Sequence, residues 1–289
     1  MPPIPDTIYF FGTCLVDLMY PQAGVSAMQL LQRAGVKVIF PPAQTCCGQP
    51  AWNSGYRDEA RSVARAQIAL FPKPIPIVIP SGSCAGMMKV HYPELFAGQP
   101  DEAQAVDVAS RVYELTEFLV DVLHIELRDL GEPLTVAVHT SCSARREMGV
   151  ADKIESLLGQ LSNVQRVEHA RKPECCGFGG TFAVKEPEIS AAMVLDKVTH
   201  IRNAQPDRLI SQDCGCLLNI SGTMAKQGDA IPHQHIAEFL WERITPHPNL
   251  PPQGGKGQEA HPAQASSSPP SPLAGEGLGM GGKFGGQSS

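Results

Sequence analysis

The sequence contains the tripeptide Cys46-Cys47-Gly48 and repeats it 129 residues later as Cys175-Cys176-Gly177. Each copy stands between two further cysteines, which are Cys14 and Cys84 in the first half and Cys142 and Cys216 in the second. The spacings agree, since 32 residues separate Cys14 from Cys46 and 33 separate Cys142 from Cys175. Such a duplicated order indicates that a whole supersecondary unit occurs twice in the chain.

Short apolar runs fall at corresponding places in the two halves. Their β-branched and aromatic residues predict strands at 7–11, 36–40, 75–79, 134–139, 164–168 and 208–210. Helical patterns lie between them, the longest at 53–70 and 187–204. Alternating strands and helices predict an α/β fold with mainly parallel sheets. The cysteines follow strands or precede helices, at the sheet edge where α/β folds commonly bind ligands.

We expect two tandem, duplicated domains, at residues 1–125 and 126–244. Residues 245–289 are rich in Pro, Gly, Ser and Gln and have few large apolar side chains. This composition predicts a disordered C-terminal tail, to which we assign no function.

Charge and hydropathy exclude several classes of function. The formal net charge is −6 and the acidic and basic residues are interspersed, so neither nucleic acid nor anionic lipid is an expected partner. No apolar run reaches the roughly 20 residues of a transmembrane helix, and the N-terminus does not resemble a signal peptide. These patterns predict a cytoplasmic protein without direct membrane insertion.

Nine cysteines in a reducing compartment favour metal or redox chemistry over disulfides. Each half supplies four candidate ligands: a first cysteine set of Cys14, Cys46, Cys47 and Cys84, and a second cysteine set of Cys142, Cys175, Cys176 and Cys216. Iron–sulfur clusters and zinc are both commonly bound by four thiolates, so the residues alone leave the two open. The ninth, Cys214, is expected to be a non-ligand.

Glycines follow both cysteine pairs, at Gly48 and at 177–180. We expect them to let the backbone approach a cluster and donate N–H groups to it. A nucleotide site is disfavoured, because residues 177–180 have neither the G-x-G-x-x-G spacing nor the lysine of a phosphate-binding loop.

Longer motifs are more specific than the cysteines alone. They read AQTCCGQPAWNSGY at 43–56, CCGFGGTFAVK at 175–185 and CLLNISG at 216–222. Over residues 5–243 the chain resembles the CCG, or cysteine-rich, domain family, which includes the cysteine-rich component of heterodisulfide reductase and the iron–sulfur component of glycolate oxidase. The three motifs look most like its lactate-utilisation protein A group.

This resemblance implies an iron–sulfur electron-transfer subunit of a multi-subunit oxidoreductase that converts L-lactate, or another 2-hydroxy acid, to the keto acid. The chain has no dinucleotide motif and no ferredoxin-type cysteine run, so a ferredoxin-domain iron–sulfur subunit and further subunits are the expected partners. Two alternatives stay open: a catalytic subunit of the disulfide reductase type, and a zinc-stabilised scaffold. We assign no catalytic residue.

The chain departs from the wider family where that family has C-x-x-C, because Ser81 and Asp213 replace the first cysteine of that pair. Four thiolates in each half favour ordinary 4Fe-4S clusters, with zinc in one half as an alternative. Ser81 and Asp213 are then expected beside the clusters, or as oxygen ligands. His139 is expected beside the second set, where the first half has Phe11, and His233 or His235 could line the same site from its far side.

Overall fold

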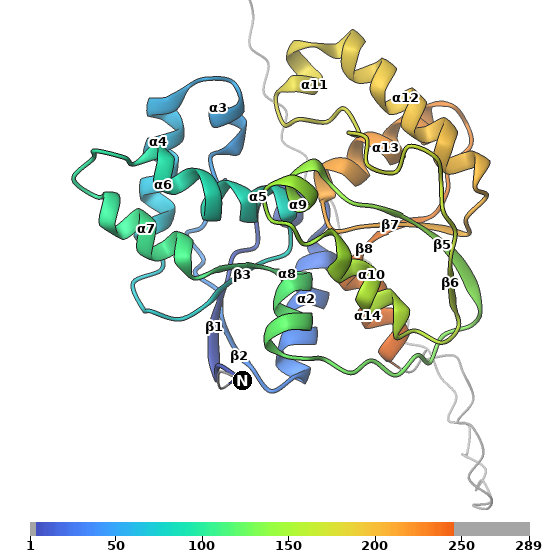
Figure 1. The fold of residues 1–289 in the computed structure, drawn as a ribbon, viewed down its shortest axis with the longest axis horizontal. Coiled ribbons are helices and arrows are strands. Elements are labelled where there is room, and N and C mark those ends of the chain that lie inside the picture. Colours follow the sequence, from blue (N-terminus) through green and yellow to red (C-terminus); the bar gives the residue numbers. More distant parts are fainter. Residues whose placement is uncertain (1–3, 246–289) are drawn as a thin grey trace, which may run out of the picture. The chain divides into compact units, whose positions relative to one another are not determined.

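The computed structural model describes residues 4–245. The predicted tail at 245–289 therefore lies outside the described residues, apart from Thr245. The predicted α/β fold is confirmed, because each half forms its own parallel sheet (Figure 1).

The first sheet has the strand order β2-β1-β3-β4, and every pair of neighbours is parallel. Its strands are β1 (Thr7–Phe10), β2 (Lys37–Ile39), β3 (Ile77–Ile79) and β4 (Val112–Glu114). The second sheet repeats this order as β6-β5-β7-β8, also parallel throughout. Its strands are β5 (Leu134–His139), β6 (Val164–Arg166), β7 (Arg208–Ser211) and β8 (His233–His235). The six predicted strands are thus present, and each sheet gains a three-residue edge strand.

Helices connect the strands of both halves. In the first half they are α1 (Cys14–Met19), α2 (Pro21–Arg33), α3 (Gln49–Asn53), α4 (Arg57–Ile68), α5 (Gly82–Gly86), α6 (Tyr92–Leu95), α7 (Glu102–Ser110) and α8 (Leu115–Glu117), with π-helical turns η1 (Met87–His91) and η2 (Phe118–Val122). In the second half they are α9 (Cys142–Arg146), α10 (Ala151–Gly159), α11 (Phe182–Lys185), α12 (Pro187–Asn203), α13 (Cys214–Lys226) and α14 (Ile236–Ile244).

One of the two long predicted helices is wrong at its start. The pattern at 53–70 predicts one helix, but α3 ends at Asn53 and α4 begins at Arg57. Gly55 separates them with a φ of +82°, a left-handed conformation that glycine adopts without strain. The other prediction, at 187–204, matches α12, which has Pro187 in its first turn.

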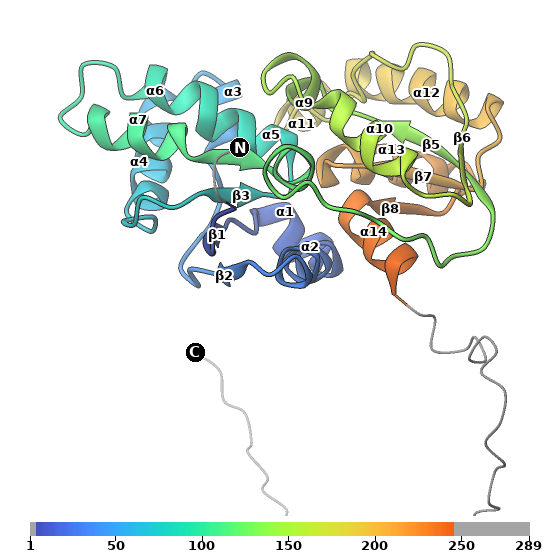
Figure 2. The same cartoon turned by 60° about the horizontal axis from the view of Figure 1, so that its bottom comes forward.

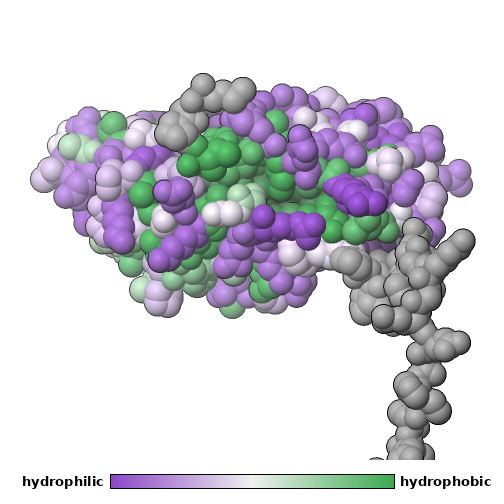
Figure 3. Space-filling model, turned by 90° about the horizontal axis from the view of Figure 1, so that it is seen from below, coloured by the Kyte–Doolittle hydropathy of each residue, from purple (hydrophilic) through white to green (hydrophobic). Residues whose placement is uncertain are grey.

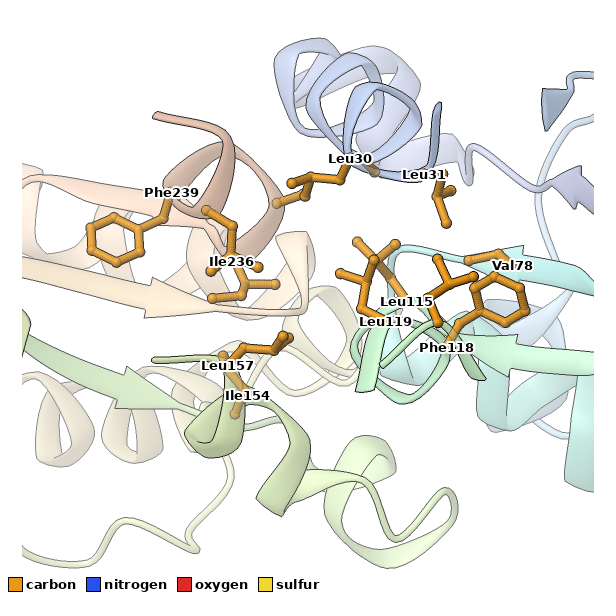
Figure 4. Close-up of a cluster of buried hydrophobic side chains, with 14 of the residues drawn as sticks. Leu30, Leu31, Val78, Leu115, Phe118, Leu119, Ile154, Leu157, Ile236 and Phe239 are labelled. Atoms are coloured by element: carbon orange, nitrogen blue, oxygen red, sulfur yellow. The ribbon is translucent and has the colours of Figure 1, made fainter. Parts of the chain in front are cut away.

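The two halves pack through a shared hydrophobic core. Leu30 and Leu31 of α2 lie in the same buried cluster as Ile236 and Phe239 of α14 (Figure 4). Figure 2 shows α2 and α14 facing each other between the two sheets. Residues 4–245 thus belong to one compact unit, and the domain boundary predicted at 125/126 falls in the segment between η2 and β5.

Candidate metal centres

Both cysteine sets gather at the carboxyl ends of the strands. The first cysteine of each set opens a helix after the first strand of its sheet, with Cys14 in α1 and Cys142 in α9. The paired cysteines lie in loops before α3 and α11, and the last cysteines lie in α5 and α13. Three distant loops therefore converge in each half, as the topology predicts.

Within each set the thiols interact with one another in an ordered chain. The chains run Cys14–Cys46–Cys47–Cys84 and Cys142–Cys175–Cys176–Cys216. The Cys47 and Cys84 sulfurs are 3.4 Å apart. All nine cysteines are free thiols. The structure therefore brings together the four predicted members of each set, in the same order in both halves.

Each set contains one thiol with a strongly lowered pKa. Hydrogen bonds from the thiols of Cys14 and Cys47 lower the pKa of Cys46 to about 3, and the corresponding contacts lower the pKa of Cys175 to about 2. The same hydrogen bonds and burial raise the pKa of Cys14 and Cys47. Four thiolates this close repel one another, so full ionisation of a set requires a bound metal cation.

Two glycines hold the cysteine pairs in place. Gly48 and Gly177 have φ values of +92° and +82°, and a Cβ on Gly177 would lie 2.7 Å from the Ser190 carbonyl oxygen. Their N–H groups donate to the sulfurs of Cys46 and Cys175 at 3.4 and 3.3 Å. The glycines thus allow the left-handed turn and its close packing, and their N–H groups donate hydrogen bonds to cysteine sulfur.

The two cysteine sets line neighbouring cavities of about 250 and 200 Å³. Both cavities are bounded by Gln49 and Ser83 of the first half and by Phe178 and Gly215 of the second. Gln49 Nε2 also donates to the Ser83 carbonyl oxygen at 3.1 Å. The two sites therefore share one wall, to which both halves contribute.

Ser81 and Asp213 meet across this wall. Asp213 Oδ1 accepts hydrogen bonds from the hydroxyls of Ser81 at 2.8 Å and Ser83 at 2.6 Å, and from the Ser83 N–H at 3.2 Å. Asp213 is 2% exposed, and its Oδ2 has no hydrogen-bond partner among the described residues. The two positions that depart from C-x-x-C thus bond to each other, which the sequence did not predict.

The remaining candidates occupy different places. Cys214 lies outside both thiol chains, packs against Val16 and Ala23 of the first half, and borders the first cavity. His139 is 1% exposed, and a ring nitrogen, Cys176 Sγ and Cys216 Sγ lie within 4.8 Å of one another. Burial lowers the pKa of His139 to about 3. The ring is therefore neutral.

The histidines of β8 have structural positions. His235 is fully buried, and its Nε2 lies 3.1 Å from the Pro80 carbonyl oxygen of the other half and 3.2 Å from that of Gln212. Its Nδ1 accepts from the Ala237 N–H at the start of α14. His233 is half-buried and lies edge-on to Tyr20. His235 thus joins the halves and caps α14.

Comparisons with known proteins agree with this architecture. The family model described as "Cysteine-rich domain" matches residues 8–89 and 136–221. The chain is 48% identical over 236 residues to "Lactate utilization protein A" of Geobacillus kaustophilus, which covers 81% of this chain and 98% of that protein. It is 44% identical to the protein of the same name from Oceanobacillus iheyensis, over 81% and 96% of the two chains.

A hypothetical protein from Helicobacter pylori has a similar crystal structure, with a TM-score of 0.59 at 14% identity. The match covers 85% of this chain and 51% of that one, and it shows the fold alone. The cysteine-rich domain match and the clustered thiols together indicate a site for a metal or an iron–sulfur cluster. Every helix within residues 4–245 falls short of the length and apolarity needed to span a bilayer.

Proposed function

The chain belongs to the cysteine-rich domain family and, within it, to the lactate utilization protein A family, and from this we infer that the protein is an iron–sulfur electron-transfer subunit. The complex it serves oxidises L-lactate. One observation carries the proposal: two four-cysteine sets lie in neighbouring cavities with a common wall. A single structural metal would need only one such set.

The residues present fit a 4Fe-4S cluster at each set. Four thiols are the ligand number that such clusters take, and N–H groups donate to Cys46 and Cys175. Each set also has a buried thiol at its base, because Cys47 and Cys176 are 2% and 3% exposed, while the first two cysteines of each set are partly exposed. The bound clusters would supply one-electron acceptance and donation.

The chain's own residues hold and separate the two centres. The turns at Gly48 and Gly177 fix the cysteine pairs, and the wall of Gln49, Ser83, Phe178 and Gly215 stands between the two cavities. This wall is a single layer of residues, which favours electron transfer between the centres within one chain. We assign no residue to the oxidation of lactate itself.

A partner subunit is the proposed source or acceptor of electrons. Leu18 and Phe40 are 74% and 43% exposed and line a further cavity, of about 270 Å³, which Cys14 also lines. Figure 3 shows that hydrophobic side chains gather on one face of the protein. Exposed apolar surface beside a redox centre fits docking of a ferredoxin-domain iron–sulfur subunit. Nine free thiols also fit a reducing compartment such as the cytoplasm.

The matched variants Cys47→Ser and Cys176→Ser test the assignment. Each removes the equivalent ligand of one set, so each is expected to lose about half of the iron and to retain the signal of the other centre. In the assembled complex, L-lactate should bleach the visible absorbance of the wild-type subunit under anaerobic conditions. Pyruvate formation without any such bleaching would contradict the electron-transfer role.

A further inference from the structure

The two centres are surrounded differently, and His139 is the clearest difference. It ends β5, and neither ring nitrogen has a hydrogen-bond partner among residues 4–245. A buried polar group without a partner destabilises the folded protein. The ring lies beside the sulfurs of Cys176 and Cys216, so a cluster bound by these sulfurs can supply the missing partner of a ring nitrogen.

The first half has no imidazole at this position. The equivalent residue, Phe11, is fully buried and packs edge-on against Phe71 with ring centroids 6.2 Å apart. The hydrophobic core of the first half thus takes up the side chain that corresponds to His139.

We propose that His139 contacts the cluster of the second set through a ring nitrogen and gives that centre a higher reduction potential than the first. The proposal rests on the proposed function. Nitrogen ligation and hydrogen bonds to sulfur both favour the reduced form of an iron–sulfur centre. A single electron added to the pair then resides at the second centre.

A reductive titration followed by electron paramagnetic resonance tests this ranking. Dithionite is the reductant, and Cys47→Ser and Cys176→Ser assign each signal to its centre. In His139→Phe, which gives the second half the residue of the first, the potential of the second centre should fall towards that of the first. The first centre, read in the same sample, should not change. His200→Phe on α12, where the ring faces Asp196, is the matched control and should change neither potential.

A measurement on the wild-type protein avoids dependence on the folding of that variant. With ¹⁵N-labelled histidine, the reduced second centre should show a hyperfine coupling to an imidazole nitrogen, and the first centre should show none. His139→Gln should abolish this coupling. Equal potentials at the two centres, or no nitrogen coupling at the second, would overturn the inference. A protein with no iron–sulfur signal at all would overturn the proposed function as well.

Discussion

Asp213 shows how a single residue links the two halves. Its position resembles a helix N-cap, yet its side chain makes no cap bond to α13 and bonds instead to Ser81 and Ser83 of the other half. Ser81 does cap its own helix, by accepting from the Cys84 N–H. The sequence marked both positions as unusual for the family. It could not show that they meet, because the contact joins residues 132 positions apart.

We expect Asp213→Ala to destabilise the protein by about 1–3 kcal/mol, because the hydroxyls of the buried Ser81 and the half-buried Ser83 lose their acceptor. Asp213→Asn keeps one acceptor oxygen and should recover part of this loss. The midpoint of urea unfolding, measured anaerobically, checks both variants. Asp152→Ala, at a side chain that is 71% exposed, is the control and should have little effect. An Asp213→Ala protein as stable as the wild type would contradict the account.

Glu114 predicts a pH dependence of stability. Its carboxyl is fully buried, with Asp213 as a nearby negative group, and burial raises its pKa from 4.5 to about 8. Between these values the unfolded chain is ionised and the folded protein keeps the proton, so the free energy of unfolding falls as the pH rises.

Each pH unit in this window lowers the free energy of unfolding by up to about 1.4 kcal/mol. The Glu114→Gln side chain cannot ionise. The free energy of unfolding of this variant, relative to that of the wild type, should therefore rise by roughly 2–3 kcal/mol between pH 5.5 and 8. Unfolding midpoints of the two proteins at both pH values check the prediction. Parallel pH profiles would show that Glu114 does not retain its proton.

At the scale of elements, the duplicated strands and both cysteine sets could be predicted from the sequence. Alternating apolar runs and local spacing carry that information. The edge strands β4 and β8 were missed because neither has an apolar run: β4 (Val112–Glu114) passes directly into α8, and β8 (His233–His235) has no apolar residue. The break between α3 and α4 was missed because Gly55 is a weak signal within a helical pattern.

The packing of α2 on α14 predicts that the halves unfold together. Leu30 is fully buried in their shared core, so Leu30→Ala should lower the free energy of unfolding by about 2–5 kcal/mol. Trp52 reports on the first half and Trp241 on the second. In single-tryptophan proteins made with Trp52→Phe or Trp241→Phe, Leu30→Ala should cause the same loss of stability whichever tryptophan reports unfolding. Leu18→Ala, at a 74% exposed side chain, is the control. A shift seen by Trp52 alone would indicate independent domains.

At the scale of the whole molecule, the two halves complete each other's sites. Phe178 and Cys214 of the second half line the cavity of the first set, and Gln49 and Ser83 of the first half line the cavity of the second. Sequence spacing could predict the ligands within each half. It could not predict this exchange of walls, because the exchange depends on how the two halves pack.

The metal content of the intact chain tests the central claim most directly. Iron, acid-labile sulfide and zinc are to be measured per chain after anaerobic purification. Two four-iron centres predict about eight irons with matching sulfide and no stoichiometric zinc. Zinc in place of iron, or iron sufficient for only one of the two sets, would contradict the account of two neighbouring redox centres.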